Sequence, residues 1–463
     1  MSRDRSGEVV IVGGGLVGSL LARFLVGRGL GVRVVERRAD PRAAGAPTAG
    51  RSINLVVTSR GIRALEAAGL WESARRLTIA VRGRLIHGRD GRCAEQPYGS
   101  RPSDRNYSIS RLELNRFLID RAERHGARFD FGWRLVGADL ARGRLSFRAE
   151  SGGGSRELDA ALAVGADGAG STLRSAIARL PGAGETIEPL SHGYKELLIP
   201  ADAAGSPRLA SGALHLWPRG RRMLMALPNT DGSFTVTLYL PLGGPDGFAA
   251  LEQPDAVVAL FRREFPDALP LIPDLESDFL RNPTGTLATV RCAPWHAAGR
   301  ALLIGDAAHA MVPFFGQGMN AGFEDCLALD RLLDAHGPDW SRLLPAFDAE
   351  RKPHADAIAE MALDNFVEMS DRAGDPAFLL RKQVERRLEL ELGRDYRSRY
   401  AMVVYGSIPY ALVLEAGRIQ EGILDELCRG LESAAALDLD RARSLIAERL
   451  TPFFGRAGVA CDS

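Results

Sequence analysis

Residues 8–38 read EVVIVGGGLVGSLLARFLVGRGLGVRVVERR and decide the fold of this chain. Val9–Val12 is a short apolar run suited to a buried parallel strand. Gly13, Gly15 and Gly18 follow at GxGxxG spacing, which permits a tight turn, leaves room for a pyrophosphate and lets helix and strand pack closely. A helix is predicted from residue 16 to about residue 29, and its free N–H groups point at that phosphate.

The same segment ends in a second predicted strand, Val32–Val35, followed by Glu36. A carboxylate about 20 residues beyond the glycines can accept hydrogen bonds from ribose hydroxyls. The pattern therefore predicts a βαβ unit that binds the AMP half of a dinucleotide. It does not separate NAD from FAD. Glycines that serve packing alone, and a Glu36 that is only a surface acid, stay open as alternatives.

Residues 300–330, RALLIGDAAHAMVPFFGQGMNAGFEDCLALD, supply a second element. Ala301–Ile304 predicts a buried strand, and Asp306 after it can accept a hydrogen bond from a ribityl hydroxyl. Gly318, Met319 and Asn320 lie at a glycine-rich helix start, whose backbone can approach a flavin ring and whose dipole stabilises negative charge there. A packing role is the alternative for both. Together, the two segments predict one FAD bound across the whole chain.

Further positions extend the predicted cofactor site. Asp167 in GADGAGSTLR predicts a turn with an acid near the pyrophosphate, although an ordinary turn between strand and helix would read the same. Arg111 could clamp the FAD phosphates, and a helix-surface arginine is the alternative. The other positions expected to contact FAD are Val17, Arg37, Arg38, Val56 and Leu135.

Composition excludes several classes of protein. The chain has 463 residues, enough for two closely associated domains, and a net charge of +1, which gives no sign of a nucleic acid or an acidic membrane surface as partner. The five cysteines are scattered without a CxxC pair, and no histidines have metal spacing, so we expect no metal and a reducing, cytoplasmic location. We find no signal peptide and no apolar run near the ~20 residues of a membrane span, and expect no membrane anchor and a monomer or homodimer.

The fold class expected is α/β with three parts. Residues 1–80, 107–185 and 295–335 are predicted to form a discontinuous, Rossmann-like FAD-binding domain. Residues 81–106 and 186–294 contain short β-branched runs punctuated by Pro and Gly, which predict an antiparallel β-sheet substrate domain. Residues 336–463 are predicted to be helical, with breaks at Pro353, Gly374 and Pro409.

The order GxGxxG, DG, GD resembles the single-component, FAD-dependent aromatic hydroxylases. A closer resemblance, to the kynurenine 3-monooxygenase family, runs from about residue 8 to about residue 420. It is carried by GRSINLVVTSRGIRALEAAGL (50–70), RGRLIHGRDGRCAEQPYG (82–99), SISRLELNRFL (108–118), HGYKELLIP (192–200), LHLWPRGRRMLMALPNTDGSFTVTLYLP (214–241) and VPFFGQGMNAGFEDC (312–326).

This resemblance implies an NAD(P)H-dependent flavin monooxygenase that hydroxylates L-kynurenine to 3-hydroxykynurenine with NADPH and O2 through a flavin C4a-hydroperoxide. It also implies that Arg84, Tyr98, Asn365 and Tyr400 form the polar end of the substrate pocket, with Arg84 and Tyr98 on the carboxylate. The chemistry agrees, because a planar guanidinium binds a carboxylate bidentately and a phenol adds a directional bond. Without the resemblance, Arg84 reads as a solvated strand charge.

Three apolar residues complete the implied pocket. Phe234 and Met369 would flank the aromatic ring of the substrate, although both types are more often plain core residues. Phe315 would lie between flavin and pocket. No protein side chain is expected to be catalytic, because the flavin carries the chemistry, and His309 is interpreted as a buried, paired histidine.

Other functions stay open on the sequence. A ring-substituted kynurenine or another aromatic acid could be the substrate of the same fold. A hydroxylase of the same fold that acts on another aromatic acid, a phenol or a polyketide is expected to lack the set Arg84, Tyr98, Asn365 and Tyr400, all of which this chain has. A flavin-dependent halogenase usually carries WxWxIP, which Trp217-Pro218 does not supply. A non-catalytic flavin-binding protein would form peroxide without product.

Overall fold

The computed structural model describes residues 7–43, 54–245, 247–371 and 375–461. The apolar run predicted as the first strand forms β1 (Val9–Val12), fully buried at the centre of a six-stranded sheet. Both neighbours of β1 are parallel to it, with Val10 opposite Ala163 on one side and Arg33 on the other. The sheet has the order β18-β19-β12-β1-β2-β8, with β18 His296–Ala297, β19 Ala301–Leu303, β12 Leu162–Gly165, β2 Val32–Glu36 and β8 Arg128–Phe131.

Helix α1 (Leu16–Gly27) follows β1 and packs against α4 (Arg111–Arg124) and α9 (Gly318–His336). It ends before the predicted residue 29, because Gly29 has a φ of +78°, the left-handed conformation that ends helices. Smaller elements complete this part of the chain: α2 Ser59–Ala67, α3 Trp71–Ala74, α5 Thr172–Ala178, α8 Asp306–His309, the sheet β3 Asn54–Val57, β7 Asn106–Ser110 and β4 Thr78–Val81, and the sheet β11 Ser155–Asp159, β10 Arg144–Ala149 and β9 Trp133–Asp139.

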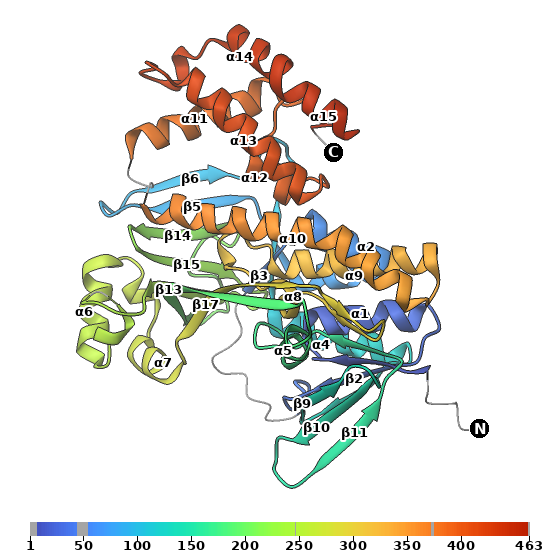
Figure 1. Cartoon of the computed structure of the whole chain (residues 1–463). Helices are drawn as coiled ribbons and strands as arrows, with labels where there is room; N and C mark the ends of the chain where they lie inside the picture. The colour runs from blue at the N-terminus through green and yellow to red at the C-terminus, as the bar shows by residue number, and fades with distance from the viewer. Residues whose placement is uncertain (1–6, 44–53, 246, 372–374, 462–463) are drawn as a thin grey trace.

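A seven-stranded sheet is the second large element (Figure 1). Its order is β17-β13-β16-β15-β14-β5-β6, with β17 Gly285–Ala293, β13 Gly184–Ile199, β16 Phe234–Pro241, β15 Arg222–Pro228, β14 Ala213–Arg219, β5 Gly83–His87 and β6 Cys93–Pro97. The sheet is mixed rather than purely antiparallel, because β5 pairs parallel to β14, with Arg84 opposite Leu214.

Two helices that the sequence did not predict, α6 (Pro254–Glu264) and α7 (Leu275–Arg281), cover one face of this sheet. Their apolar side chains pack on Phe234, Val236 and Leu238 of β16. The opposite face packs against the C-terminal helices through a separate apolar cluster that contains Tyr98, Phe315 and Tyr239. The seven-stranded sheet is therefore covered on both faces, by α6 and α7 on one and by the C-terminal helices on the other. The predicted domain boundaries stay a prediction.

The C-terminal helices are α10 Trp340–Asp371, α11 Pro376–Glu391, α12 Arg399–Val404, α13 Tyr410–Leu427, α14 Leu439–Leu445 and α15 Thr451–Ala457. The predicted break at Pro353 is wrong, because α10 continues through it. Burial of Ala355, Ile358 and Met361 on α10 outweighs the roughly 3 kcal/mol that an internal proline costs. The predicted break at Pro409 is found, because α12 ends at Val404 and Pro409 directly precedes α13, whereas Gly374 lies outside the described residues.

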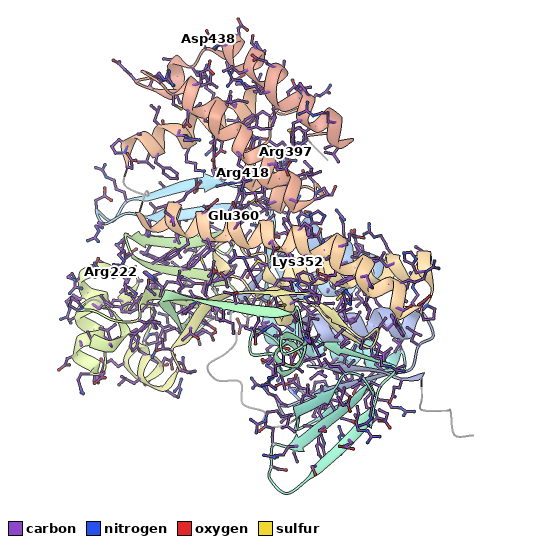
Figure 2. All side chains as sticks on the ribbon, in the orientation of Figure 1. Arg222, Lys352, Glu360, Arg397, Arg418 and Asp438 are labelled. Carbon is purple, nitrogen blue, oxygen red and sulfur yellow. The ribbon has the colours of Figure 1, made fainter. Side chains whose placement is uncertain are left out.

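Helix α10 crosses the middle of the view in Figure 1, with the six-stranded sheet below it and α11–α15 above it. An ion pair links it to α13, with Arg418 Nη2 lying 2.8 Å from Glu360 Oε1, and both residues are labelled on their helices in Figure 2. Within the described ranges, no helix combines the length and the apolar character that crossing a bilayer requires.

Candidate active site

The turn between β1 and α1 is shaped by close backbone approaches. A Cβ on Gly13, whose φ is +106°, would lie 2.4 Å from the carbonyl oxygen of Ala166, so the turn after β12 touches the turn after β1. A Cβ on Gly18 would lie 2.0 Å from the Gly13 oxygen. Gly15, in contrast, has no atom within 4 Å of such a Cβ. Among the described residues, no side chain caps the start of α1, and none fills the space beside Gly15.

Glu36 holds this turn from the end of β2. One carboxylate oxygen accepts the N–H of Gly14 at 2.7 Å and the other accepts the N–H of Arg38 at 3.0 Å. Burial raises the pKa of Glu36, but Arg38 and these N–H groups outweigh it, so the pKa lies below its usual value and the carboxylate is ionised. Arg37 and Arg38 are exposed at the rim.

The second predicted half of the site lies at the starts of α8 and α9. Asp306 is exposed between buried neighbours, and its Oδ1 would lie 3.7 Å from a Cβ on Gly318. No side chain caps α9, so the first N–H groups of the helix, beginning at Gly318 and Met319, have no intrahelical partner. The side chain of Asn320 is fully buried and donates to the carbonyl oxygen of Val56 at 2.9 Å, which holds β3 against this helix start.

The other predicted cofactor positions bond to or pack against other parts of the protein, or are exposed to solvent. Asp167 accepts the N–H of Thr172 at 2.8 Å and so caps α5, and burial raises its pKa. Leu135 is buried in β9. Val17 packs between α1 and α9, where a Cβ on Gly322 would come within 2.6 Å of it. Arg111 is exposed at the first position of α4.

Four of the predicted substrate residues gather in one cluster. The Arg84 guanidinium carbon on β5 lies 5.7 Å from the ring centre of Tyr98 and 5.2 Å from that of Tyr400 on α12. The Tyr98 and Tyr400 rings stack with centres 6.0 Å apart. Phe315, in the short turn η5 (Pro313–Phe315), also stacks with Tyr400, with ring centres 5.7 Å apart. Residues far apart in the chain thus build one polar end with an aromatic lining.

The charge of this cluster is unbalanced. Among the described residues, no carboxylate forms an ion pair with Arg84. Burial lowers the pKa of Arg84, but the neighbouring phenols outweigh it and the pKa is raised, so Arg84 stays a cation. Burial raises the pKa of Tyr98, so its phenol is neutral at physiological pH. A half-buried cation beside two phenol groups is suited to binding a carboxylate from a ligand.

Phe234 does not belong to this cluster, which corrects the prediction that it lines the substrate ring. It is fully buried on the α6 and α7 face, with its ring centre 5.6 Å from that of His215. Side chains alternate along β16, so Tyr239 faces the cluster in its place. Asn365 on α10 donates to the carbonyl oxygen of Phe314 at 2.7 Å, next to Phe315. Met369 lies in α10, but its side chain lies outside the described part of the chain.

Comparison with known proteins decides the family. A model of the FAD binding domain family matches residues 6–362. The kynurenine 3-monooxygenase of Myxococcus xanthus is 47% identical over 454 residues, which are 98% of this chain and 97% of that protein. The chain belongs to the kynurenine 3-monooxygenase family. The protein of that name from Xanthomonas oryzae pv. oryzae is 45% identical over 97% of this chain and 98% of its own length.

Solved structures show the same fold at lower identity. The tetrameric form of 2-methyl-3-hydroxypyridine-5-carboxylic acid oxygenase matches with a TM-score of 0.64 and 22% identity, over 81% of this chain and 96% of the other. A probable FAD-dependent monooxygenase from Pseudomonas aeruginosa matches with a TM-score of 0.61 and 20% identity, over 79% and 97%. The fold class and the resemblance to the kynurenine 3-monooxygenase family are thereby confirmed.

The geometry of the two helix starts fits FAD, the cofactor of the kynurenine 3-monooxygenase family. Free N–H groups at α1 face open space beside Gly15, as a diphosphate requires, and the exposed Asp306 carboxylate stands at the uncapped start of α9. Both features lack a structural partner among the described residues, whereas Glu36 and Asp167 are already engaged.

Sequence reasoning missed two polar residues beside Tyr400. Asn106, the first residue of β7, donates from Nδ2 to the Tyr400 hydroxyl at 3.4 Å. Tyr405 lies with its ring centre 6.2 Å from that of Tyr400. The only signal for Asn106 was its place just before the matched segment 108–118 of the kynurenine 3-monooxygenase family.

His309 is buried and lies 2.6 Å from Asp325 Oδ2, which agrees with the interpretation of a paired histidine. Arg351 contacts the other oxygen of Asp325, so the histidine belongs to a buried charge network behind the start of α8. Among the residues that the structure describes, no three His, Cys, Asp or Glu side chains gather as metal ligands do.

Proposed function

We propose that this chain is an FAD-dependent monooxygenase that hydroxylates L-kynurenine with NADPH and O2 at the ring carbon ortho to the amino group, giving 3-hydroxykynurenine. The observation that carries the proposal is the half-buried Arg84, which lies beside the rings of Tyr98 and Tyr400 without a carboxylate partner among the described residues. A substrate carboxylate would neutralise this cation. The relatives named kynurenine 3-monooxygenase support the substrate class.

In this proposal the chain orients the substrate. Arg84 binds the carboxylate bidentately, and the Tyr98 and Tyr400 hydroxyls donate to the same group. The aromatic ring then extends along the apolar lining that includes Phe315 and Tyr239, where water is excluded. Asn365 fixes the turn that carries Phe315 by its bond to the Phe314 carbonyl. The aniline nitrogen itself activates the ring carbon, so orientation is the main demand on the protein.

The cofactor roles follow from the same geometry. Backbone N–H groups at the start of α1 would hold the diphosphate, Glu36 would accept from ribose hydroxyls, and Asp306 would accept from the ribityl chain. The start of α9, beginning at Gly318, would supply backbone N–H groups to the ring system. Bound FAD supplies the hydride-accepting and oxygen-transferring chemistry.

Location and assembly belong to the proposal as well. The free cysteines fit a reducing, cytoplasmic compartment. We expect a monomer or homodimer, which size-exclusion chromatography with light scattering measures directly.

The test is NADPH oxidation by the purified FAD-loaded protein with and without L-kynurenine, followed by mass spectrometry of the product. We expect stimulated oxidation and a product heavier than kynurenine by one oxygen. Stimulated oxidation that yields only hydrogen peroxide would redirect the search to another aniline acid. Oxidation that L-kynurenine does not stimulate would refute the substrate.

A further inference from the structure

One polar atom beside the substrate cluster has no partner among the residues that the structure describes. Asn106 Oδ1 is buried without a hydrogen bond to any of them, and the residue is only 4% exposed. The other end of the same amide, Nδ2, lies 3.4 Å from the Tyr400 hydroxyl. Because both atoms belong to one small planar group, the unpaired oxygen also lies close to the polar end of the pocket. An unpaired buried carbonyl oxygen costs about 1–3 kcal/mol, so a ligand that supplies a donor would recover it.

The cluster around it supplies mainly donors. Arg84 is a cation with no acceptor, and the phenols of Tyr98 and Tyr400 are expected to donate to a carboxylate. Asp104, the nearby carboxylate, is already occupied, because it accepts from Arg397 Nη2 at 3.3 Å and from the N–H of Ser100 at 3.1 Å. An α-amino acid carries an ammonium group on the carbon next to its carboxylate. That ammonium needs an acceptor within reach of the carboxylate site.

We propose that Asn106 Oδ1 accepts a hydrogen bond from the α-ammonium group of the substrate, and that this bond selects an α-amino acid over the matching acid without the amino group. The inference rests on the proposed function and deepens it. In the orientation found, Nδ2 donates to the Tyr400 oxygen, which leaves the Tyr400 hydrogen for the substrate carboxylate and Oδ1 for the ammonium. Both charged groups of the amino-acid head are then satisfied.

A reversed amide would predict a different role. Oxygen and nitrogen of an asparagine exchange by a half-turn of the side chain. With Nδ2 facing the pocket, Asn106 would be a further donor to the carboxylate. Its loss would then weaken every acid equally, so ligands with and without the α-amino group separate the two roles.

The experiment measures the Kd of two ligands for the FAD-loaded protein by calorimetry. The ligands are L-kynurenine and 4-(2-aminophenyl)-4-oxobutanoate, which is the same molecule without the α-amino group. The variant Asn106→Leu keeps the size of the side chain and removes the acceptor. Tyr405→Phe is the matched control, because it removes the hydroxyl of Tyr405, which also has no partner and lies beside Tyr400.

We expect Asn106→Leu to raise the Kd of L-kynurenine about tenfold or more and to change that of the analogue by less than about twofold, since hydrogen bonds to charged groups are the stronger class. KM should rise by a similar factor while kcat stays nearly constant, because the lost bond is made in ground state and transition state alike. Tyr405→Phe should affect both ligands equally.

Should Asn106→Leu fail to fold, Asn106→Asp gives the same information. Its carboxylate also accepts from an ammonium but repels the analogue, so it should widen the preference for L-kynurenine. An equal loss of affinity for both ligands in Asn106→Leu would overturn the role of Asn106 and leave the proposed function standing. A loss of affinity for L-kynurenine alone in Tyr405→Phe would do the same. Wild-type protein that binds neither ligand would overturn the proposed function and this assignment with it.

Discussion

Replacing Arg84 by methionine should weaken the binding of L-kynurenine without lowering the stability of the ligand-free protein. The guanidinium can make two charge-assisted hydrogen bonds to a carboxylate, each contributing about 1.5–3 kcal/mol. Their loss amounts to about 3–6 kcal/mol, which corresponds to a rise of about 10²- to 10⁴-fold in the Kd of L-kynurenine. In the ligand-free protein, however, Arg84 is a cation beside Tyr98 and Tyr400 without an ion-pair partner among the described residues.

Because this cation has no ion-pair partner among the described residues, a second expectation concerns the stability of the ligand-free protein. An apolar side chain of similar length removes the cost of holding a charge in this cluster, so Arg84→Met should leave the free energy of unfolding unchanged or raise it by up to about 2 kcal/mol. Calorimetric titration with L-kynurenine and urea unfolding of the ligand-free protein measure the two quantities. Arg82→Met, at an exposed neighbour on the chain, is the control and should change neither. A loss of affinity below tenfold together with a clear loss of stability would show that Arg84 is a structural residue.

Other predictions concern the helices around the site. Tyr410→Phe removes a hydroxyl that donates to Gln317 Oε1 at 2.8 Å and should lower the free energy of unfolding in urea by about 1–2 kcal/mol. Tyr396→Phe removes a hydroxyl without a partner among the described residues and should leave the free energy of unfolding unchanged. Equal losses in the two variants would contradict this prediction. Asp325→Asn breaks a buried charge network and should cost about 3–5 kcal/mol, against less than about 1 kcal/mol for Asp330→Asn in an ion pair near the surface of the same helix. Burial lowers the pKa of His354 from 6.5 to about 4, so the unfolded chain binds more protons than the folded chain between these pH values, and the free energy of unfolding falls as the pH falls through this window. His354→Gln should abolish about 1–2 kcal/mol of that fall, measured by urea titrations at pH 7 and pH 4. An equal fall in stability for both proteins would refute this prediction.

The parts of the fold that local sequence determines were predicted well. The strand at Val9–Val12 and the glycine turn after it depend on an apolar run and on backbone approaches that only glycine permits. Helices α6 and α7 were missed because they lie in a part of the chain whose other segments read as short strands. Their apolar residues pack on the sheet in the folded protein. The unbroken α10 shows the same limit, since burial along the helix overrides the local preference of Pro353.

The substrate cluster shows a different limit. Phe234 and Tyr239 occupy opposite faces of β16, and the choice between them depends on strand parity. Parity is read from alternation of apolar and polar residues, but β16 is buried on both faces, so FTVTLYLP carries almost no alternation. Arg84 and Tyr400 were found only through the resemblance, because neither a strand arginine nor a helix tyrosine signals a pocket. Their roles stay predictions until ligand binding is measured.

The position of Tyr400 depends on an arginine far from it in the chain. Its helix α12 has only 6 residues, which is too short to be stable alone. Arg60, fully buried at the start of α2, donates to the carbonyl oxygen of Val403 at the end of α12 and forms an ion pair with Glu324 on α9. The same side chain thus links α12, which carries Tyr400, to α9, which begins at Gly318. We therefore expect the position of Tyr400 relative to the start of α9 to depend on this buried charge network.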